Sequence, residues 1–467
     1  MYNPVSPCAA EFICHDEILA TLQYAKENKR NAKRIDSVLF KATQLKGLDY
    51  RDVSLLLACE LPEQNEALLR LARQIKEEFY GKRIVLFAPL YLSNYCVNSC
   101  VYCPFHAQNK QILRRKLTQE EIAREVIALQ DMGHKRIAIE AGEDPQHSPI
   151  EYILESIETI YSIKHKNGAI RRANVNIAAT STENYRKLHE AGIGTYILFQ
   201  ETYHRERYAA LHPAGPKSDY DWHTEAMDRA MLGGIDDVGL GVLFGLENYQ
   251  YELAALLMHA AHLEARFGVG PHTISVPRVK QAEGINIADF SGISDDVFAK
   301  IIACIRVALP YAGMIISTRE NQIMRARGLA LGISQISGAS KTSVGGYSKE
   351  AGSEQFELSD NRTLGEIVHW LMDLGYIPSF CTACYREGRT GDRFMELCKT
   401  RQMQNICQPN ALMTLQEFLM DYATPGTREI GENLIAKELL GIPNQQMREL
   451  CMGHIEKIRR GGRDFRV

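Results

Sequence analysis

Three cysteines fall within eight residues, directly after an apolar run, in the segment Cys96-Val-Asn-Ser-Cys100-Val-Tyr-Cys103. Thiolates at this spacing can converge from a single loop on a small inorganic cluster. A structural zinc site normally closes with four ligands, and no fourth cysteine follows in this loop. His106, three residues later, is the alternative, because it would complete a zinc site. The spacing favours an iron–sulfur cluster with three protein ligands.

A second group of cysteines lies near the C-terminus. Cys381 and Cys384 form a C-x2-C pair, and Cys407 follows after 22 intervening residues, with Cys398 between them. These thiols form a second candidate metal centre. Cys398 has the spacing of a small buried residue on a helix, whereas Cys407 stands two residues before Pro409, where we expect a helix to end. A zinc ribbon built from all four cysteines is the alternative.

Polar residues follow other apolar runs as well. The segment 141–145, Ala-Gly-Glu-Asp-Pro, comes after the second run, and Glu201 follows the fourth. By themselves they indicate a Gly–Pro loop and a solvent-facing acid. His272 lies in the segment GPHTISVPR (270–278) on the sixth run, and Arg319 follows the seventh. A neutral imidazole suits Fe(II), and a guanidinium group matches a carboxylate in a bidentate manner. A buried structural histidine and an ion pair with a nearby loop carboxylate are the respective alternatives.

Eight short β-rich runs must position these residues, and helical stretches alternate with them. The runs are 84–90, 136–141, 173–179, 195–200, 237–244, 272–277, 314–318 and 332–337. Apolar strands that alternate with amphipathic helices predict a parallel sheet covered by helices. Eight such units predict an α/β fold with a closed (β/α)8 TIM-type barrel, and an open doubly wound sheet is the alternative. Thr118 and Glu121 form a capping box that predicts one helix start, with a stop at Gly133.

The chain divides into three expected regions. Residues 1–80 have helical periodicity and form an N-terminal extension, whose last helix we expect to stop at Gly81. The barrel occupies residues 81–345. Residues 346–467 form a mainly helical C-terminal domain that carries the second group of cysteines.

Composition bounds the class of protein. The 467 residues are 45% hydrophobic and 24% charged, with a net charge of −3, which argues against a general nucleic-acid or anionic-membrane binder. No apolar segment reaches the ~18 residues of a membrane span. The N-terminus lacks a basic region followed by an apolar stretch, so no secretory signal is expected. Twelve cysteines then indicate a reducing compartment, and we expect a cytoplasmic, metal-bearing protein.

The C-x3-C-x2-C spacing, with Tyr102 before the last cysteine, resembles the radical S-adenosylmethionine (SAM) enzymes. In that superfamily three cysteines hold a [4Fe–4S] cluster, and its fourth iron takes the amino and carboxylate groups of SAM. Segment 141–145 resembles the Gly-Gly-Glu-Pro-type motif that contacts the SAM amino group, although Ala141 replaces the first glycine. Glu201 resembles the carboxylate that holds the ribose. The residues that the resemblance assigns to SAM are Gly142, Glu143, Asp144 and Glu201.

The C-x2-C-x22-C pattern and the stretch CTACYREGRTGDRFM resemble one family in the aromatic amino-acid lyase group, the tyrosine lyases of [FeFe]-hydrogenase maturation. The resemblance implies an auxiliary [4Fe–4S] cluster on Cys381, Cys384 and Cys407, with Cys398 as a spare thiol. It further implies a labile iron bound by His272.

The seventh run ends in Ser-Thr-Arg-Glu, which resembles the lyase segment whose arginine holds the substrate carboxylate. The resemblance therefore implies Arg319 as the anchor, with Ser337 and Ser340 as hydroxyl partners. The implied activity is cleavage of the Cα–Cβ bond of L-tyrosine to p-cresol and dehydroglycine, whose conversion to CO and cyanide on iron serves hydrogenase assembly. The implied partners are a ferredoxin- or flavodoxin-type reductant and other hydrogenase maturases.

Two other functions stay open. A 2-iminoacetate synthase (tyrosine lyase) of thiazole and thiamine biosynthesis would release the fragment, but it is not expected to carry the C-terminal cysteines. A non-catalytic iron–sulfur carrier would need cysteines, but it would not need the segments around Glu143, His272 and Arg319 at one barrel mouth.

Overall fold

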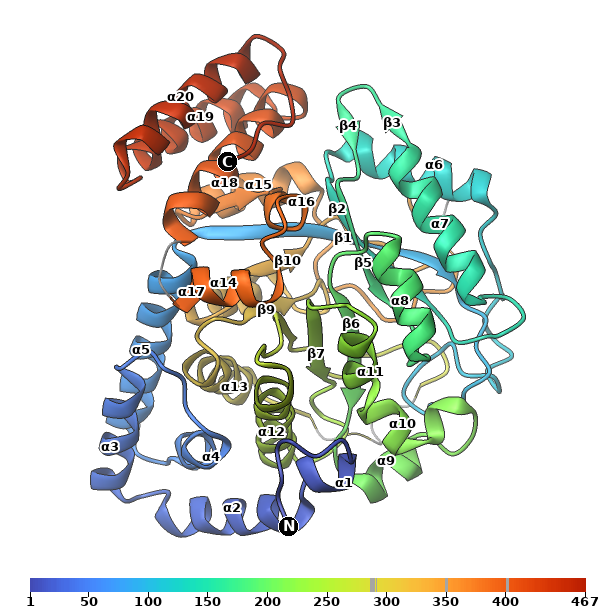
Figure 1. Cartoon of the computed structure of the whole chain (residues 1–467), viewed down its shortest axis with the longest axis vertical. Coiled ribbons are helices and arrows are strands. Elements are labelled where there is room, and N and C mark those ends of the chain that lie inside the picture. The colour runs from blue at the N-terminus through green and yellow to red at the C-terminus, as the bar shows by residue number, and fades with distance from the viewer. Residues whose placement is uncertain (286–289, 291, 349–351, 400–402) are drawn as a thin grey trace.

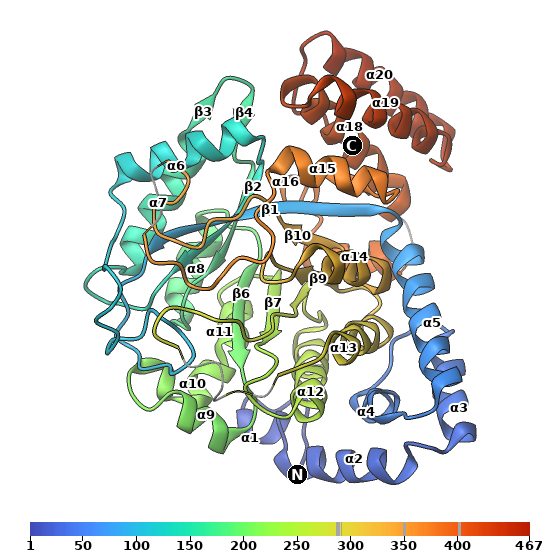
Figure 2. The ribbon, with the colours of Figure 1, turned by 180° about the vertical axis from the view of Figure 1, so that it is seen from behind.

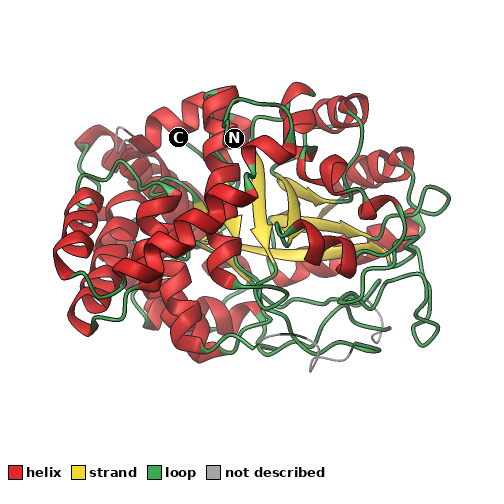
Figure 3. Ribbon diagram, turned by 90° about the horizontal axis from the view of Figure 1, so that it is seen from below, coloured by secondary structure: helices red, strands yellow, loops and turns green. Residues whose placement is uncertain are grey.

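The computed structural model describes residues 1–285, 290, 292–348, 352–399 and 403–467. Its main sheet has nine strands in the order β10-β9-β8-β7-β6-β5-β2-β1-β11, and β10 also pairs with β1. This pairing closes eight parallel strands into a barrel surrounded by helices (Figure 3). The strands of the barrel are β1 (Arg83–Ser93), β2 (Arg136–Ala141), β5 (Arg172–Asn176), β6 (Tyr196–Glu201), β7 (Val238–Val242), β8 (Thr273–Ser275), β9 (Gly313–Ile316) and β10 (Gln335–Ser337).

All eight predicted runs form barrel strands, and the open-sheet alternative is wrong because β10 pairs with β1. The strands are apolar on both faces, because one face packs against the surrounding helices and the other lines the barrel interior. On β1, Leu86, Ala88 and Leu90 are fully buried on the outer side among the helices, whereas Phe87 and Pro89 face the barrel interior. This alternation puts every second residue of a strand into the barrel.

Helices follow the strands and cover the outside of the barrel. The capping box of Thr118 and Glu121 begins α6, and Gly133 ends it with a φ of 103°, as the sequence predicts. The helices that follow β1 to β9 are α6 (Gln119–Met132), α7 (Ile150–Ser162), α8 (Thr182–Glu190), α9 (Arg205–Leu211), α10 (Tyr220–Thr224), α11 (Ala226–Leu232), α12 (Tyr249–Phe267), α13 (Asp295–Ala308) and α14 (Gln322–Leu331). A 3-10 turn, η1 (Pro216–Ser218), and a small hairpin of β3 (Lys164–His165) and β4 (Gly168–Ala169) complete the connections.

The N-terminal region is helical, as predicted, and packs on the outside of the barrel. Its helices are α1 (Ala9–Phe12), α2 (His15–Asn28), α3 (Ala32–Ala42), α4 (Tyr50–Ala58) and α5 (Pro62–Tyr80). Helices α2 and α4 contact α12, and α4 and α5 contact α13. In Figures 1 and 2 these helices lie at the end of the molecule opposite the last two helices of the chain.

The C-terminal region is mainly helical but adds one strand that the sequence does not predict. Strand β11 (Ile377–Ser379) is only three residues long, too short for a periodicity, and it pairs with the first residues of β1, from Arg83 to Val85. It carries the chain to Cys381 beside the barrel. The helices are α15 (Leu364–Asp373), α16 (Ala383–Arg386), α17 (Gly391–Lys399), α18 (Met403–Asp421), α19 (Pro425–Leu440) and α20 (Gln445–Arg459).

The expected helix end at Pro409 is wrong, because α18 continues through this proline to Asp421. Proline removes one hydrogen bond from a helix interior. The residues that follow it, from Ala411 to Leu415, are almost entirely buried, so tertiary packing holds the helix together across the proline. No described helix has both the length and the apolar character that a membrane crossing requires.

Candidate active site

The loop of the first three cysteines begins where β1 ends, at the C-terminal mouth of the barrel. Two other loops hold it in place through backbone hydrogen bonds. Val97 N–H donates to the carbonyl of Glu143 at 2.8 Å, and Ser99 N–H donates to the carbonyl of Ala214 at 3.0 Å. The loop is therefore tied both to the segment after β2 and to the segment after α9.

The three thiols line a cavity of about 240 Å3 at this mouth. Burial raises the pKa of Cys100 to about 11 and that of Cys103 to about 12. No three His, Cys, Asp or Glu side chains in the described part of the chain converge closely enough to hold one metal ion. A [4Fe–4S] cluster spreads its ligands over several irons, so its cysteines need not meet at one point. The donors therefore fit a [4Fe–4S] cluster.

Gly142 lets the loop after β2 approach the cysteine loop. A Cβ atom at this position would lie 2.3 Å from the carbonyl oxygen of Tyr95, so no larger residue fits. The next residue, Glu143, lines the cavity and accepts a 2.6 Å hydrogen bond from the Asn98 amide. Burial raises the pKa of Glu143. These two residues lie beside the thiols, as the sequence predicts.

Asp144 has a different position. Its carboxylate accepts hydrogen bonds from the N–H groups of Gln146 and His147, both at 2.9 Å. The His147 ring in turn stacks on Tyr95, with ring centroids 3.8 Å apart. Asp144 thus shapes the loop and is not among the side chains that line the cavity.

Glu201 lines the cavity from the end of β6, in a strained backbone conformation with a φ of 69°. Its carboxylate forms a 2.9 Å ion pair with Lys217, a residue that the sequence analysis missed. The residues just after it are held by Glu252 on α12, which accepts hydrogen bonds from the Thr202 hydroxyl and from the Tyr203 N–H. Several elements therefore fix this one side chain.

Arg319 reaches the same cavity from the loop after β9. Its guanidinium group lies 3.5 Å from the centre of the Phe356 ring. The neighbouring acid, Glu320, is occupied by Arg278, whose Nε donates to it at 2.9 Å. Arg319 forms no ion pair within the described residues, so the alternative of a simple loop ion pair does not hold. A cation that forms no ion pair within the described residues is suited to an anionic ligand, although Glu201 and Glu140 act on it through charge.

The two candidate serines differ in their hydrogen bonding. Ser337 lines the cavity, and its hydroxyl accepts a 3.2 Å hydrogen bond from Thr318 N–H. Ser340 also lines the cavity, but its buried hydroxyl has no hydrogen-bond partner among the described residues. Ser337 therefore supports the segment before Arg319, and Ser340 is available to a ligand.

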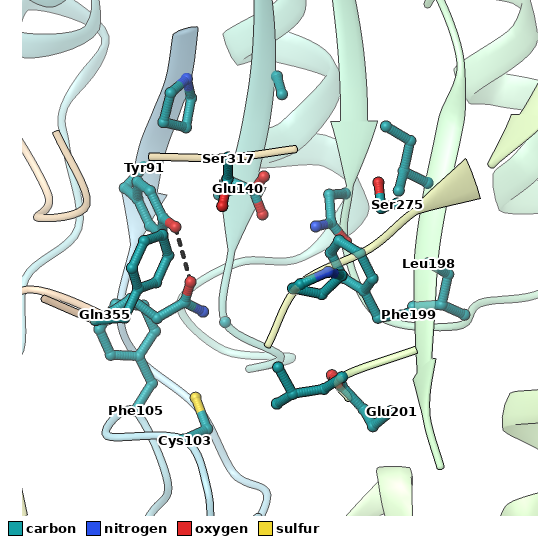
Figure 4. A pocket seen from close by; sticks show the side chains of 18 of the residues that line it. Tyr91, Cys103, Phe105, Glu140, Leu198, Phe199, Glu201, Ser275, Ser317 and Gln355 are labelled. Atoms are coloured by element: carbon teal, nitrogen blue, oxygen red, sulfur yellow. Dashed lines mark hydrogen bonds between the residues drawn. The ribbon is translucent and has the colours of Figure 1, made fainter. Parts of the chain in front are cut away.

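Side chains that the sequence analysis missed complete the cavity. Tyr91 donates a 2.7 Å hydrogen bond to Gln355, and both side chains line the cavity (Figure 4). Glu140, on β2, points into the same space as Ser317 (Figure 4). The signal that could have identified Glu140 is its position: it is two residues before Gly142, so strand alternation turns it into the barrel.

The second group of cysteines lies at the opposite, N-terminal end of the barrel. β11 pairs there with the start of β1, and Arg136, at the start of β2, donates a 2.8 Å hydrogen bond to the Cys381 carbonyl. The Cys384 and Cys407 thiols interact directly through a hydrogen bond. The side chain of Cys398 lies outside the described residues.

His272 lies at this same end, just before β8. Its Nδ1 is 3.6 Å from the carboxylate of Asp237, and its ring centre is 6.4 Å from that of Tyr385, the residue after Cys384. The segment that contains His272 does reach the mouth, where Ser275, Val276 and Pro277 line the cavity, but His272 itself does not. Its segment runs through the barrel wall, so His272 and Pro277 come out at opposite ends.

Comparisons with known proteins agree with this architecture. The profile of the radical SAM superfamily matches residues 90–257, and that of the biotin and thiamin synthesis associated domain matches residues 275–377. A closed parallel barrel with a three-cysteine loop after its first strand defines the class of radical SAM enzymes. A solved structure, "Crystal structure of HydG: A maturase of the [FeFe]-hydrogenase", is 53% identical, with a TM-score of 0.96, and covers 98% of this chain and 100% of its own. This chain belongs to the HydG family.

Two further relatives extend the comparison. The HydG maturase of Carboxydothermus hydrogenoformans is 40% identical, with a TM-score of 0.85, over 96% of this chain and 99% of that chain. The 2-iminoacetate synthase of Escherichia coli K12 is 30% identical over 70% of this chain and 85% of its own length.

Proposed function

We propose that this enzyme cleaves the Cα–Cβ bond of L-tyrosine to p-cresol and dehydroglycine and converts dehydroglycine to CO and cyanide for the iron site of [FeFe]-hydrogenase. The extent of the similarity carries this proposal. A HydG structure covers 98% of the chain, whereas the 2-iminoacetate synthase of Escherichia coli matches 70%. A protein that only releases dehydroglycine does not require the rest of the chain.

At the mouth, Cys96, Cys100 and Cys103 would hold the [4Fe–4S] cluster. The neighbouring residues Gly142, Glu143 and Glu201 would bind SAM, and Asp144 would hold their loop in shape through its hydrogen bonds to Gln146 and His147. Reductive cleavage of SAM at such a cluster supplies the 5′-deoxyadenosyl radical that abstracts a hydrogen atom. Two arrangements support these assignments: Asn98 orients the Glu143 carboxylate, and Lys217 neutralises that of Glu201.

Tyrosine would bind deeper in the same cavity. Arg319 would hold its carboxylate through a bidentate contact, and Ser337 and Ser340 would contribute hydroxyl groups. The unpaired guanidinium of Arg319 and the unpartnered hydroxyl of Ser340 support this role. An enclosed cavity also keeps water from a reactive intermediate.

At the other end of the barrel, Cys381, Cys384 and Cys407 would hold an auxiliary [4Fe–4S] cluster. His272 would bind an extra labile iron next to it. The interacting thiols of Cys384 and Cys407, and the position of His272 near Tyr385, support this second site. A neutral imidazole is a good ligand for Fe(II), and the pKa of His272 is lowered by burial.

The chain would work with a ferredoxin- or flavodoxin-type reductant and with the other hydrogenase maturases. Iron–sulfur chemistry and twelve cysteines suit a reducing compartment, so we place the enzyme in the cytoplasm.

The deciding experiment supplies anaerobic enzyme with tyrosine, SAM and dithionite, and measures p-cresol, CO and cyanide. All three products are expected, with about eight or nine irons per chain, since two clusters and one labile iron contribute. Release of p-cresol without CO, with about four irons, would indicate a 2-iminoacetate synthase. Absence of p-cresol would indicate an iron–sulfur carrier. Cys100→Ala is the negative control and should form no product.

A further inference from the structure

One carboxylate in the cavity has no role in the proposed function. Glu140 is the inward-facing residue near the end of β2, and it lines the cavity that also contains Arg319 and Ser340. Its partners come from three other elements: Tyr91 from β1, Asn176 from β5 and Arg319 from the loop after β9. The charge of Arg319 and the amide of Asn176 both favour the carboxylate form of Glu140.

Glu140 and Arg319 face the same space without forming an ion pair with each other. Each affects the pKa of the other through charge, so they are neighbours, yet the guanidinium group lies against the Phe356 ring. Glu201 and Lys217 pair with each other, Glu143 accepts from Asn98, and Lys280 lies near Glu320, so Arg319 and Glu140 are the cationic and acidic groups of the cavity that form no ion pair within the described residues. An amino acid in its zwitterionic form has the complementary pair of charges on a single carbon atom.

We propose that Glu140 binds the α-ammonium group of the substrate amino acid and removes one proton from it before the hydrogen atom is abstracted. The inference rests on the proposed function, in which Arg319 holds the carboxylate of tyrosine. In this step an N–H bond of the ammonium group breaks, its electron pair stays on nitrogen, and the proton forms an O–H bond with the Glu140 carboxylate. The substrate then has a neutral amine, and no oxidant is consumed.

The environment of Glu140 suits a base of this kind. Burial raises the pKa of its carboxyl group to about 8, while Arg319 and Asn176 oppose this rise. A catalytic base is most efficient when its pKa lies near the working pH. Glu201 and Cys103 act through charge on Arg319, more strongly than Glu140 does, and not on Glu140 itself.

A binding experiment tests recognition of the ammonium group. Holoenzyme with SAM, and without reductant, is titrated with tyrosine and with 3-(4-hydroxyphenyl)propanoate, which lacks the amino group. In Glu140→Gln we expect the Kd of tyrosine to rise about tenfold, since a hydrogen bond to a charged group is lost, and the Kd of the analogue to stay within about twofold. Equal weakening of both ligands, or of neither, would overturn the proposal.

The pH dependence tests the proton transfer. In the wild type, kcat/KM for p-cresol should increase with pH and level off above about 8, because only the carboxylate form accepts the proton. Glu140→Gln should lose this inflection and run about 100-fold slower, and Glu140→Asp should restore part of the rate. An unchanged inflection in Glu140→Gln would refute the role of Glu140 as the base.

Different results would contradict the proposed function and the role of Glu140. If wild-type enzyme forms no p-cresol from tyrosine, the proposed function is wrong. If it forms p-cresol and Glu140→Gln matches it in binding and in pH profile, only the role of Glu140 is wrong. If Glu140→Gln does not fold, the same two ligands are titrated into Glu140→Asp. The shorter carboxylate should weaken the binding of tyrosine and leave the binding of the analogue unchanged.

Discussion

The state of single polar side chains decides what this cavity can bind. A buried polar group without a partner is unfavourable, so proteins rarely leave one unless a ligand supplies the missing contact. Ser340 is in this condition at the mouth of the barrel, and Arg319 forms no ion pair within the described residues, whereas Glu320 and Ser337 already have partners. A side chain without a partner is therefore expected to bind the ligand, whereas a neighbour that already has a partner supports the structure around it.

Ser340→Ala should raise the Kd of tyrosine by up to about tenfold, the effect of one lost hydrogen bond. The protein should keep its stability, because the hydroxyl has no partner to lose. Isothermal titration of the holoenzyme with tyrosine provides the measurement. Ser343→Ala is a matched control, since its hydroxyl is also buried and unpartnered but does not line the cavity. An equal effect of the two substitutions would remove Ser340 from the binding site.

At the scale of elements, the ends of the strands carry the chemistry and the helices hold these ends in position. The loop after β6 is an example, because Glu201 has a positive φ and requires support from outside the loop. Glu252, in the first turn of α12, provides it through Thr202 and Tyr203. This carboxyl group is fully buried, and burial raises its pKa to about 8.

Glu252→Gln should therefore change how stability depends on pH. Between about 4.5 and about 8 the folded protein keeps a proton on Glu252 that the unfolded chain releases, so the wild type loses stability as pH rises. The glutamine variant lacks this loss. Its free energy of unfolding, measured relative to that of the wild type, should therefore increase by up to about 1.4 kcal/mol per pH unit. Urea unfolding across this range gives the slope. Glu264→Gln, an exposed acid on the same helix, should keep the wild-type slope.

Helix α18 presents Cys407 to the second group of cysteines, and the Cys384 and Cys407 thiols are hydrogen-bonded. Cys407→Ser should lose the spectroscopic signal of the auxiliary cluster together with CO formation. Cys398→Ser, the matched control on α17, should retain both. Electron paramagnetic resonance and CO trapping provide the measurements, and the reverse pattern would make Cys398 the third ligand.

At the scale of the whole molecule, the barrel separates two groups of chemically active residues. The cysteines after β1 lie at the C-terminal mouth, and those after β11 lie at the N-terminal end. Between them the interior contains an apolar layer contributed by four strands: Phe87, Ala138, Ile197 and Ile315, with Phe199 packed against it.

The double substitution of Cys381 and Cys384 by Ala should leave p-cresol formation largely intact and abolish CO. The reason is this separation, since neither residue lines the cavity at the mouth. Parallel assays of both products, with circular dichroism to confirm folding, test it. Joint loss of p-cresol and CO in a folded protein would show that the two ends do not work independently.

The sequence by itself determined the eight strands and the three cysteines that follow β1, whereas it only favoured a closed barrel, which the pairing of β10 with β1 decided. These features depend on local patterns: apolar alternation, a capping box and cysteine spacing within one loop. It also placed Gly142, Glu143, Glu201 and Arg319 at strand ends, and in a parallel barrel all C-terminal strand ends meet at one face.

Only the tertiary structure decided which of the other residues meet. The start of a strand and its end face opposite sides of the barrel, so His272 belongs with Tyr385 and the second group of cysteines, far from Arg319. Glu140 carries no motif, and its role depends on Arg319, 179 positions away in the chain. Whether a polar side chain is already paired depends on distant partners, and no local pattern encodes it.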